Sequence, residues 1–530
     1  MKINLPEEFK KNMTDLLGDD AVAQYFEAMD EEPVSSFRLN PLKKHKNDLV
    51  YITKEFPTAI EAVSWEKMGR YYTEPDRPGK HPLHAAGAYY VQEASAMAPA
   101  AFLMAEPLRG EEKILDLCAA PGGKTTQIAS YMKGRGLLVA NEIIPSRAKI
   151  LSENVERCGI KNCVVTNCTP QEMSERFTSF FDRIMVDAPC SGEGMFRKNP
   201  EAVKEWSMEI VKICADRQDE ILDCAADMLS PGGIMVYSTC TFNRLEDEGS
   251  VERFLVRHPE FRLDYTWNYD NGADLHNGNA FNDKISFDVE VDISNKNIDG
   301  ISQIDDGGEK AAKVDIMFNN RILPHTENGE GQFFVRLVKE GNHTQEQTEK
   351  KTVEEYENSL HKILNKEQIK LFEEWCDSTC SSLHNFMEVI TDEFYGDSGN
   401  SVYRGDCGNS VPCFFEVRVF GSNLYLVPGQ LPDMSQLKVL RWGLHLGSFE
   451  KKRFEPSHAL ALALGADDVT DCVQLSMDEA VQYLKGMSVI IPQGSATGWT
   501  LVCYEGFSFG WGKAVGGMLK NHYPKGLRWM

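Results

Sequence analysis

The chain has 530 residues, of which 42% are hydrophobic and 26% are charged, and its formal net charge is −24 at pH 7. This length suffices for about three or four compact domains. No apolar run approaches the roughly 20 residues of a membrane-spanning helix, which excludes a helical membrane protein. The negative charge excludes a generally basic nucleic-acid-binding protein, because phosphate binding depends on Lys and Arg side chains.

The start of the chain, residues 1–8, lacks the basic and apolar segments of a secretory signal, so we expect a soluble, cytoplasmic protein. Its 14 cysteines are then expected to be reduced thiols. Cys376 and Cys380 lie four apart on an expected helix over 365–381, with no second ligand pair nearby. We therefore predict that they pack in a core, and we predict no metal site.

Residues 1–110 are expected to form a leader region with amphipathic helices over 7–17 and 21–29. From Lys113 onward, apolar strand-like runs alternate with helical segments. The expected strands cover residues 113–118, 136–142, 163–167, 181–188 and 233–240. This alternation predicts an α/β fold with a parallel sheet and crossover helices.

The second half of the chain is expected to hold an insertion and two further modules. Residues 266–312 are acidic and rich in Asn and Gly, which predicts a solvated insertion or loop between the sheet and a last strand pair at 321–324 and 332–337. One domain would then span residues 111–340, followed by a polar linker over 341–355. An α+β domain over 356–447 and a module of short strands over 448–530 would complete the chain.

Small residues form a loop directly after the first expected strand. Residues 119–124 read Ala-Ala-Pro-Gly-Gly-Lys and precede a helix, so a ligand could approach the backbone closely there. Glu142 ends the next strand 19 residues after Gly123, near the offset of roughly 20 at which an acid meets ribose hydroxyls. The loop alone is equally consistent with a tight structural turn. With Glu142 in register, it predicts a site for a nucleotide-like cofactor.

Two cysteines leave later strands at the same predicted edge of the sheet. Asp187 and Cys190 follow the fourth strand, and Cys240 follows the fifth. A thiolate attacks electron-poor carbon readily, and sites in open α/β sheets lie at such strand ends. These positions predict cysteine-dependent catalysis beside the cofactor. Cys158, Cys163, Cys214 and Cys224 are instead expected to be small packed residues.

Three blocks of sequence resemble, in order, the signature blocks of the NOL/NOP/Sun RNA 5-methylcytosine methyltransferases. They are residues 116–125 (DLCAAPGGKT), 187–194 (DAPCSGEG) and 237–241 (YSTCT). Residues 38–40 and 89–97 resemble the leader region of that family. Residues 453–460 and 520–528 resemble the bacterial RsmF-type branch, whose members end in a PUA-like RNA-binding module.

The resemblance implies a Rossmann-like class I methyltransferase that transfers a methyl group from S-adenosylmethionine to carbon 5 of cytosine in RNA, most simply in small-subunit 16S rRNA. Cys240 would add to carbon 6 of the base, and Cys190 would assist breakdown of that adduct. Asp187 would bond the base and lie beside the cofactor, and Glu142 would hold the ribose. The methionine and ribose side of the cofactor would be lined by Cys118, Ala119, Ala120, Pro121, Gly122, Gly123 and Lys124.

Some alternatives stay open at this stage. Asn167 stands where the family usually has an acid near the adenine, so its side chain or a backbone group would make that contact. The substrate could be tRNA, or the chain could be an RNA-binding assembly factor with an idle methyltransferase domain. RNA would be contacted through two basic stretches. These are 33–47, with Arg38, Lys43, Lys44 and Lys46, and 506–530, with Lys513, Lys520, Lys525 and Arg528 among aromatic residues.

Overall fold

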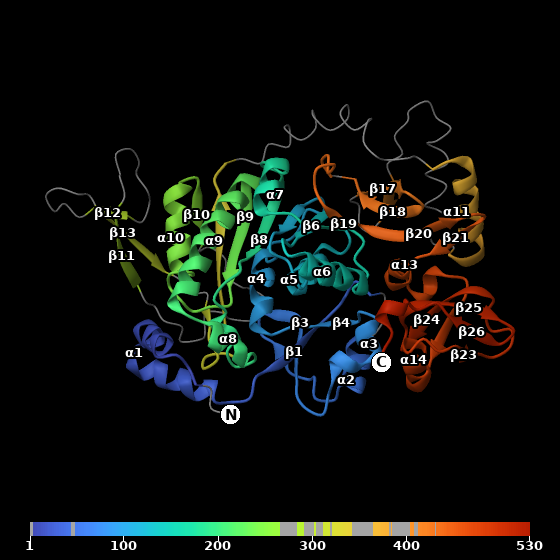
Figure 1. Ribbon diagram of the computed structural model, residues 1–530, viewed down its shortest axis with the longest axis horizontal. Helices are drawn as coiled ribbons and strands as arrows, with labels where there is room; N and C mark the ends of the chain where they lie inside the picture. Colours follow the sequence, from blue (N-terminus) through green and yellow to red (C-terminus); the bar gives the residue numbers. More distant parts are fainter. Residues whose placement is uncertain are drawn as a thin grey trace.

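The computed structural model describes residues 4–43, 48–264, 321–341, 364–380, 383, 412–429 and 431–530, and the backbone of four strands that lie between these ranges. Figure 1 shows the leader region in blue along one side of a central sheet, and the C-terminal modules in orange and red at one end of the molecule. The predicted linker over 341–355 lies outside the described residues except for its first position.

The leader region contains a bent helix and a small antiparallel sheet. Helix α1 (Glu7–Met29) is interrupted at Gly18, whose φ of +75° and ψ of 168° are not helical, so it consists of two helical segments, as predicted. The sheet order is β2-β3-β1-β4. Its strands are β1 (Ser35–Leu39), β2 (Ala62–Val63), β3 (Glu66–Tyr72) and β4 (Tyr89–Val91), and its helices are α2 (Asp48–Glu55), η1 (Pro78–Lys80), α3 (Pro82–Ala85), η2 (Ser95–Met97) and α4 (Ala98–Leu103).

The central sheet has the strand order β10-β15-β9-β8-β5-β6-β7-β19, and β14 pairs with β15 beside this row. Its strands are β5 (Lys113–Asp116), β6 (Leu137–Asn141), β7 (Cys163–Thr166), β8 (Phe181–Asp187), β9 (Leu229–Thr239), β10 (Phe261–Leu263), β14 (Arg321–Ile322), β15 (Gln332–Lys339) and β19 (Val439–Trp442). The five strands β5 to β9 are parallel, as predicted. The α/β parallel-sheet prediction is thus confirmed.

Helices cover both faces of the central sheet, which explains the buried apolar runs in the middle of its parallel strands. They are α5 (Gly123–Met132), α6 (Pro145–Arg157), α7 (Pro170–Arg176), α9 (Met208–Met228) and α10 (Glu248–Arg257), with η3 (Glu193–Met195) and α8 (Pro200–Glu205) in one crossover. Successive residues of β8 point to opposite cores: Ile184 and Val186 pack in one, and Met185 packs in the other.

Strand β19 reaches the central sheet from a part of the chain that the sequence assigned to the next domain. It pairs antiparallel with β7, with Val439 opposite Thr166 and Trp442 opposite Val164. An exposed strand edge carries unpaired N–H and C=O groups that favour aggregation. Strand β19 therefore covers that edge of the parallel part of the central sheet.

Part of the acidic insertion forms strands, whereas the sequence predicted a solvated insertion or loop. Strands β11 (Lys284–Glu290), β12 (Ile301–Gln303) and β13 (Ala311–Met317) form a small antiparallel sheet in the order β11-β13-β12. The rest of the span from 266 to 312 lies outside the described residues.

Two further sheets form the C-terminal part. One has the order β16-β17-β18-β20-β21 and the other β22-β24-β25-β26-β23. Their elements are α11 (Lys366–Thr379), β16 (Tyr403–Asp406), β17 (Pro412–Phe420), β18 (Asn423–Pro428), β20 (Leu444–Glu450), β21 (Arg453–Pro456), α13 (His458–Ala463), η7 (Ala466–Asp468), β22 (Cys472–Leu475), α14 (Met477–Leu484), β23 (Val489–Ile490), β24 (Gly498–Tyr504), β25 (Phe507–Val515), β26 (Met518–Asn521) and η8 (Lys525–Leu527). Cys376 and Cys380 are buried in a hydrophobic core of this part, as predicted. The expected boundary between residues 447 and 448 falls within β20, and β20 pairs with β21 as far as Pro456, so the boundary between the two modules lies after that residue.

The leader sheet and the last module share one hydrophobic core. Phe37 and Tyr89 from the leader pack in the same cluster as Tyr483, Phe509 and other residues of the last module. Figure 1 places the C-terminus beside α3. The leader sheet and the last module are therefore held together, and each supplies apolar surface that the other covers.

Burial overturns part of the expected basic surface over 33–47. The side chains of Arg38 and Lys43 are buried, with 1% and 6% of their surface exposed. The Arg38 guanidinium forms hydrogen bonds inside the fold. Nζ of Lys43 donates to the carbonyl of Leu462 in the C-terminal part. Lys44 and Lys46 lie outside the described residues. Two of the four predicted basic residues of that stretch are therefore structural.

Candidate active site

The ends of three neighbouring strands bring the predicted site residues together. The sheet order β9-β8-β5-β6 places the ends of β9, β8 and β5 next to one another, and Asp187 at the end of β8 pairs in register with Ser238 of β9. Cys190 leaves β8 and Cys240 leaves β9 at this edge. The tertiary structure thus brings Asp187, Cys190 and Cys240 to one edge of the sheet, as their positions at strand ends predicted.

The two thiols are in direct contact. Sγ of Cys190 lies 3.3 Å from Sγ of Cys240, and the backbone N–H of Cys240 also donates to Sγ of Cys190 at 3.3 Å. The hydrogen bond to Cys240 and burial raise the pKa of the Cys190 thiol well above its usual range. Cys190 therefore stays protonated at neutral pH and can donate its S–H to the sulfur of Cys240.

A buried carboxylate holds the loop that carries Cys190. Oε2 of Glu246 accepts a hydrogen bond of 2.9 Å from the backbone N–H of Ser191 and one of 3.1 Å from the amide of Gln218. The same Gln218 amide donates to the carbonyl of Pro189. Burial raises the pKa of Glu246 to about 7. Because Glu246 follows Cys240 by six residues, it ties the loop of one cysteine to that of the other.

Three side chains orient the carboxylate of Asp187. Nζ of Lys124 lies 2.8 Å from Oδ2, the hydroxyl of Ser238 donates to Oδ1 at 2.7 Å, and the amide of Gln332 donates to Oδ1 at 3.3 Å. The Asp187 side chain keeps 33% of its surface exposed. It is fixed in direction and remains accessible to a ligand.

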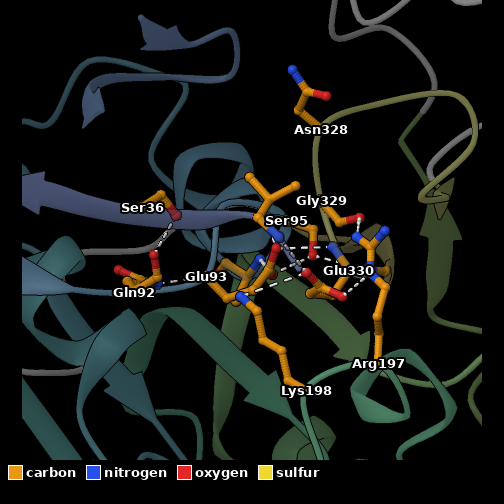
Figure 2. Close-up of polar contacts among 12 residues, drawn as sticks. Ser36, Gln92, Glu93, Ser95, Arg197, Lys198, Asn328, Gly329 and Glu330 are labelled. Carbon is orange, nitrogen blue, oxygen red and sulfur yellow. Dashed lines mark hydrogen bonds and ion pairs between the residues drawn. The ribbon is translucent and has the colours of Figure 1, made fainter. Parts of the chain in front are cut away.

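Figure 2 shows the polar contacts that fix the segment immediately before Gln332. Glu330 pairs with Arg197 at 2.7 Å, and both side chains are buried. The N–H of Glu330 donates to Glu93, and the N–H of Gly331 donates to the hydroxyl of Ser95. The leader, the crossover after Cys190 and the start of β15 therefore meet at one point, from which Gln332 reaches Asp187.

The glycine loop is also held from the leader side. Gly122 has φ of +111°, a conformation that favours glycine, and no side chain caps the helix that follows it. The buried Arg38 guanidinium donates to the carbonyl of Gly123 at 3.2 Å and to the hydroxyl of Thr126 at 2.8 Å. Arg147 donates to the carbonyl of Ala120 at 2.8 Å. The loop is thus held by hydrogen bonds from the leader and from α6.

Glu142 and Asn167 lie beside each other at the end of the next two strands. Oε1 of Glu142 accepts from the N–H of Ile144 at 2.9 Å, and Arg147 lies 3.3 Å from Oε2. The Asn167 amide donates to the carbonyls of Glu142 and Ile143, while its oxygen accepts from Lys438 at 2.7 Å. Both functions of the Asn167 side chain are used within the protein, which disfavours it as the adenine contact.

A further acid at this edge was not predicted as a site residue. Asp116 is fully buried, Oδ2 accepts from Thr125 at 2.6 Å, and Oδ1 has no hydrogen-bond partner. Burial raises its pKa to about 7. A buried polar atom without a partner is costly, so Oδ1 suits a ligand that donates a hydrogen bond. The ammonium group of an amino-acid-like cofactor would fit.

Models of known protein families match the chain along most of its length. A family described as 16S rRNA methyltransferase RsmB/F matches residues 103–338, and the N-terminal domain of 16S rRNA methyltransferase RsmF matches residues 5–94. The RsmF rRNA methyltransferase first C-terminal domain matches 412–464. The methyltransferase RsmF PUA domain matches 470–529.

Full-length relatives agree with these matches. The chain is 30% identical over 535 residues to ribosomal RNA small subunit methyltransferase F of Vibrio vulnificus strain YJ016, with 99% of this chain and 98% of the relative covered. The chain belongs to the RsmF family. The protein of that name from Shewanella oneidensis is also 30% identical, with 93% of this chain and 90% of the relative covered. The predicted resemblance to the RsmF-type branch is thereby confirmed.

A solved structure is also similar to this RsmF-family chain. It is a methyltransferase homolog protein from Pyrococcus horikoshii, with a TM-score of 0.49, 24% sequence identity, and 64% of this chain and 96% of that chain covered.

The structure adds Asp116, Glu246 and Gln332 to the residues expected at the site of this RsmF-family chain. Asp116 could have been found as an acid that ends an apolar strand. Glu246 and Gln332 carry no comparable signal, because their partners lie 55 and 145 residues away in the sequence.

In the described part of the chain, no cluster of three or more His, Cys, Asp and Glu side chains has the arrangement of a metal site. No described helix is long and apolar enough to cross a membrane.

Proposed function

We propose that this RsmF-family chain is an S-adenosylmethionine-dependent RNA (cytosine-C5)-methyltransferase that acts on small-subunit ribosomal RNA in the cytoplasm. The contact of 3.3 Å between Cys190 and Cys240, beside the oriented carboxylate of Asp187, is the observation that carries the proposal. Family membership supports the RNA substrate, since the curated relatives are named as methyltransferases of ribosomal RNA of the small subunit.

Cys240 is proposed as the nucleophile. Its thiolate sulfur bonds to carbon 6 of cytosine, and the electron pair of the 5,6 double bond makes carbon 5 nucleophilic. The Cys190 thiol, held protonated beside it, donates a hydrogen bond that stabilises the Cys240 thiolate before attack. Asp187 accepts hydrogen bonds from the base, and Lys124, Ser238 and Gln332 keep its carboxylate in that orientation.

Release of the product reverses the bond to Cys240. Carbon 5 gains the methyl group as the donor's sulfur–methyl bond breaks and S-adenosylhomocysteine is left. The proton on carbon 5 is then lost to solvent, the 5,6 double bond re-forms and the Cys240 thiolate leaves carbon 6. The Cys190 S–H again donates to the departing sulfur. This is a direct physical basis for a role of Cys190 in breakdown of the adduct.

The cofactor is proposed to lie over the glycine loop, between the ends of β5 and β6. S-adenosylmethionine supplies the electrophilic methyl group. The loop from Cys118 to Lys124 would line its methionine and ribose side, Glu142 would accept from the ribose hydroxyls, and the unpartnered Oδ1 of Asp116 would accept from the ammonium group. The Cys118 thiol, whose pKa is raised by burial, would be an uncharged neighbour.

The test is transfer of labelled methyl groups from S-adenosylmethionine to three separate pools: purified ribosomal RNA, assembled small subunits and tRNA. Nucleoside analysis then identifies the product. Label in 5-methylcytidine from either ribosomal pool supports the proposal. Label only in tRNA would identify tRNA, rather than ribosomal RNA, as the substrate. No label in any pool, together with unchanged RNA binding by a Cys240→Ala variant, would favour an assembly factor with an idle site.

A further inference from the structure

The segment that follows Cys190 lies directly against the segment that follows Cys240. The hydroxyls of Ser191 and Thr241 are 2.8 Å apart, and the N–H of Gly194 donates to the carbonyl of Cys240 at 2.8 Å. A Cβ atom on Gly194 would lie only 3.0 Å from that carbonyl oxygen. The two segments are therefore packed so closely that a side chain at this glycine would force them apart.

Glu193 is the charged residue of this contact, and only 1% of its surface is exposed. Its Oε2 accepts from the N–H of Phe242 at 2.9 Å, and its Oε1 accepts from the indole N–H of Trp206 at 2.9 Å. The side chains of Thr241 and Asn243 also form hydrogen bonds with this carboxylate. Burial raises the pKa of Glu193, and these hydrogen bonds oppose the rise. One buried carboxylate thus gathers the three residues that follow Cys240.

Glu193 and Glu246 hold the two cysteine segments reciprocally. Glu246 follows Cys240 in the chain and accepts from the backbone N–H next to Cys190. Glu193 follows Cys190 and accepts from a backbone N–H two residues after Cys240. Each segment therefore carries the acid that holds the other. Movement of one thiol away from the other would leave a buried donor or acceptor unpaired, which costs free energy.

Aromatic residues of the leader helix α1 pack against the donors to Glu193. The ring of Tyr25 lies 5.8 Å from that of Phe242, and the ring of Phe9 lies 5.9 Å from that of Trp206. All four residues belong to one hydrophobic core. Hydrogen bonds are stronger in such surroundings than in water. The leader therefore supports the bonds that reach from Glu193 to the Cys240 segment.

We propose that Glu193 is a positioning residue, which holds the sulfur of Cys240 in contact with that of Cys190 although its own carboxylate touches neither base nor cofactor. The inference rests on the proposed function, because it assumes that Cys240 is the nucleophile. Both proposed roles of Cys190 require its S–H to reach the Cys240 sulfur, 3.3 Å away. A displacement of about 1 Å in such a contact can slow a reaction on the order of 100-fold.

The experiment compares Glu193→Gln and Glu193→Ala with Glu201→Gln in the full chain. Gln keeps the size of the side chain but replaces one acceptor oxygen by a donor, whereas Ala removes both acceptors. Glu201 lies on α8, in the same crossover, and its side chain is 69% exposed, so it is the matched control. All proteins carry Cys472→Ser, because Cys472 and Cys503 form another close thiol pair at 3.2 Å. Melting midpoints check that each variant folds.

The first measurement needs no RNA. Phenylarsine oxide bonds its arsenic to two thiols that lie close together and releases water, so its affinity reports how well Cys190 and Cys240 are held in contact. We expect Glu193→Gln to bind it about tenfold more weakly than the parent protein, because the thiol pair is no longer preorganised. Glu201→Gln should match the parent. Cys240→Ser should lose tight binding, which locates the arsenical.

The second measurement is methyl transfer to ribosomal RNA. We expect kcat to fall about tenfold in Glu193→Gln and about 100-fold in Glu193→Ala. KM for RNA and the Kd for S-adenosylmethionine should stay at the parent values, since Glu193 would contact neither ligand. A purely structural role would lower the melting midpoint of Glu193→Gln and leave the arsenical affinity of its folded form unchanged.

Two outcomes would overturn the inference. One is a folded Glu193→Gln protein that binds phenylarsine oxide as tightly as the parent does, and the other is a loss of activity confined to KM. If Glu193→Ala does not fold, Glu193→Gln still decides between these outcomes. Failure of the proposed function is a separate result: the parent would form no 5-methylcytidine in any RNA pool, while the arsenical would still report on the two thiols.

Discussion

Nζ of Lys124, in the first turn of α5, lies 2.8 Å from Oδ2 of Asp187 at the end of β8. This ion pair joins the glycine loop, on the proposed cofactor side, to the strand that carries the proposed base-binding acid. The Lys124 side chain is only 8% exposed, so the pair is shielded from solvent on that side. A change at one site is therefore expected to disturb the other.

Lys124→Met tests this coupling. Met keeps most of the buried aliphatic volume of Lys but leaves Asp187 without its cation, so the carboxylate loses its fixed direction. We expect methyl transfer to fall about 100-fold, with a smaller loss of cofactor affinity. Turnover and cofactor binding by calorimetry would be measured beside Lys149→Met, which alters an exposed lysine of α6. Equal turnover in both variants would contradict a role for the pair.

Cys190→Ala is expected to trap protein on RNA. Cys240 could still add to the base, but the S–H that assists its departure is missing, so the covalent adduct should accumulate and survive denaturing electrophoresis. Cys240→Ala and the double variant should give no trapped complex. Cys224→Ala, which alters a buried cysteine packed away from the site, is the matched control. Trapping by the double variant would show that the roles are wrongly assigned.

Glu246 is expected to make stability depend on pH. Its folded-state pKa of about 7 lies above the value near 4.5 expected in an unfolded chain, so its contribution is fully present below about pH 4.5 and is lost as pH rises through 7. The change is on the order of 3 kcal/mol. Glu246→Gln should therefore gain melting temperature relative to the wild type between pH 5 and pH 8.

The same comparison isolates Glu246 from other buried acids. Asp116 also has a pKa raised to about 7 by burial, but it titrates alike in both proteins. A difference in midpoint between Glu246→Gln and wild type that stays constant over this pH range would contradict the prediction.

Arg38→Lys should destabilise the protein although it preserves the charge. A lysine cannot reproduce the planar fork that bonds Gly123, Thr126 and Gln92 together. We expect a drop in the melting midpoint of about 5 °C and about tenfold weaker binding of S-adenosylmethionine, because the start of α5 is no longer held. An unchanged cofactor affinity in a folded variant would show that the glycine loop keeps its shape without the Arg38 guanidinium.

A chain ended after residue 341 should aggregate rather than yield an isolated methyltransferase domain. Without β19, the edge of β7 loses its partner, and the leader loses the last module that shares its core. Solubility and the cooperativity of thermal unfolding would be compared with those of the full chain. A monomeric truncated protein with a sharp melting transition would show that the edge needs no cover.

The parallel part of the sheet could be predicted because each strand, buried on both faces, contains an apolar run and alternates with a helix. The chemistry-bearing residues Cys190, Cys240 and Asp187 were found for the same reason, since strand ends of a parallel sheet meet at one edge. Their catalytic roles remain predictions. The resemblance of residues 116–125, 187–194 and 237–241 to one family needed only local sequence.

Only the tertiary structure decided which distant segments complete the site. Gln332 reaches Asp187 because the antiparallel strand β15 returns, after a long insertion, to the open edge of β9. Arg38 is polar in sequence but buried in the fold, since its guanidinium finds acceptors on α5 that no local pattern records. Strand β19 joins β7 because an edge strand has unpaired backbone groups. Sequence periodicity records which face of an element is buried, but not which remote element buries it.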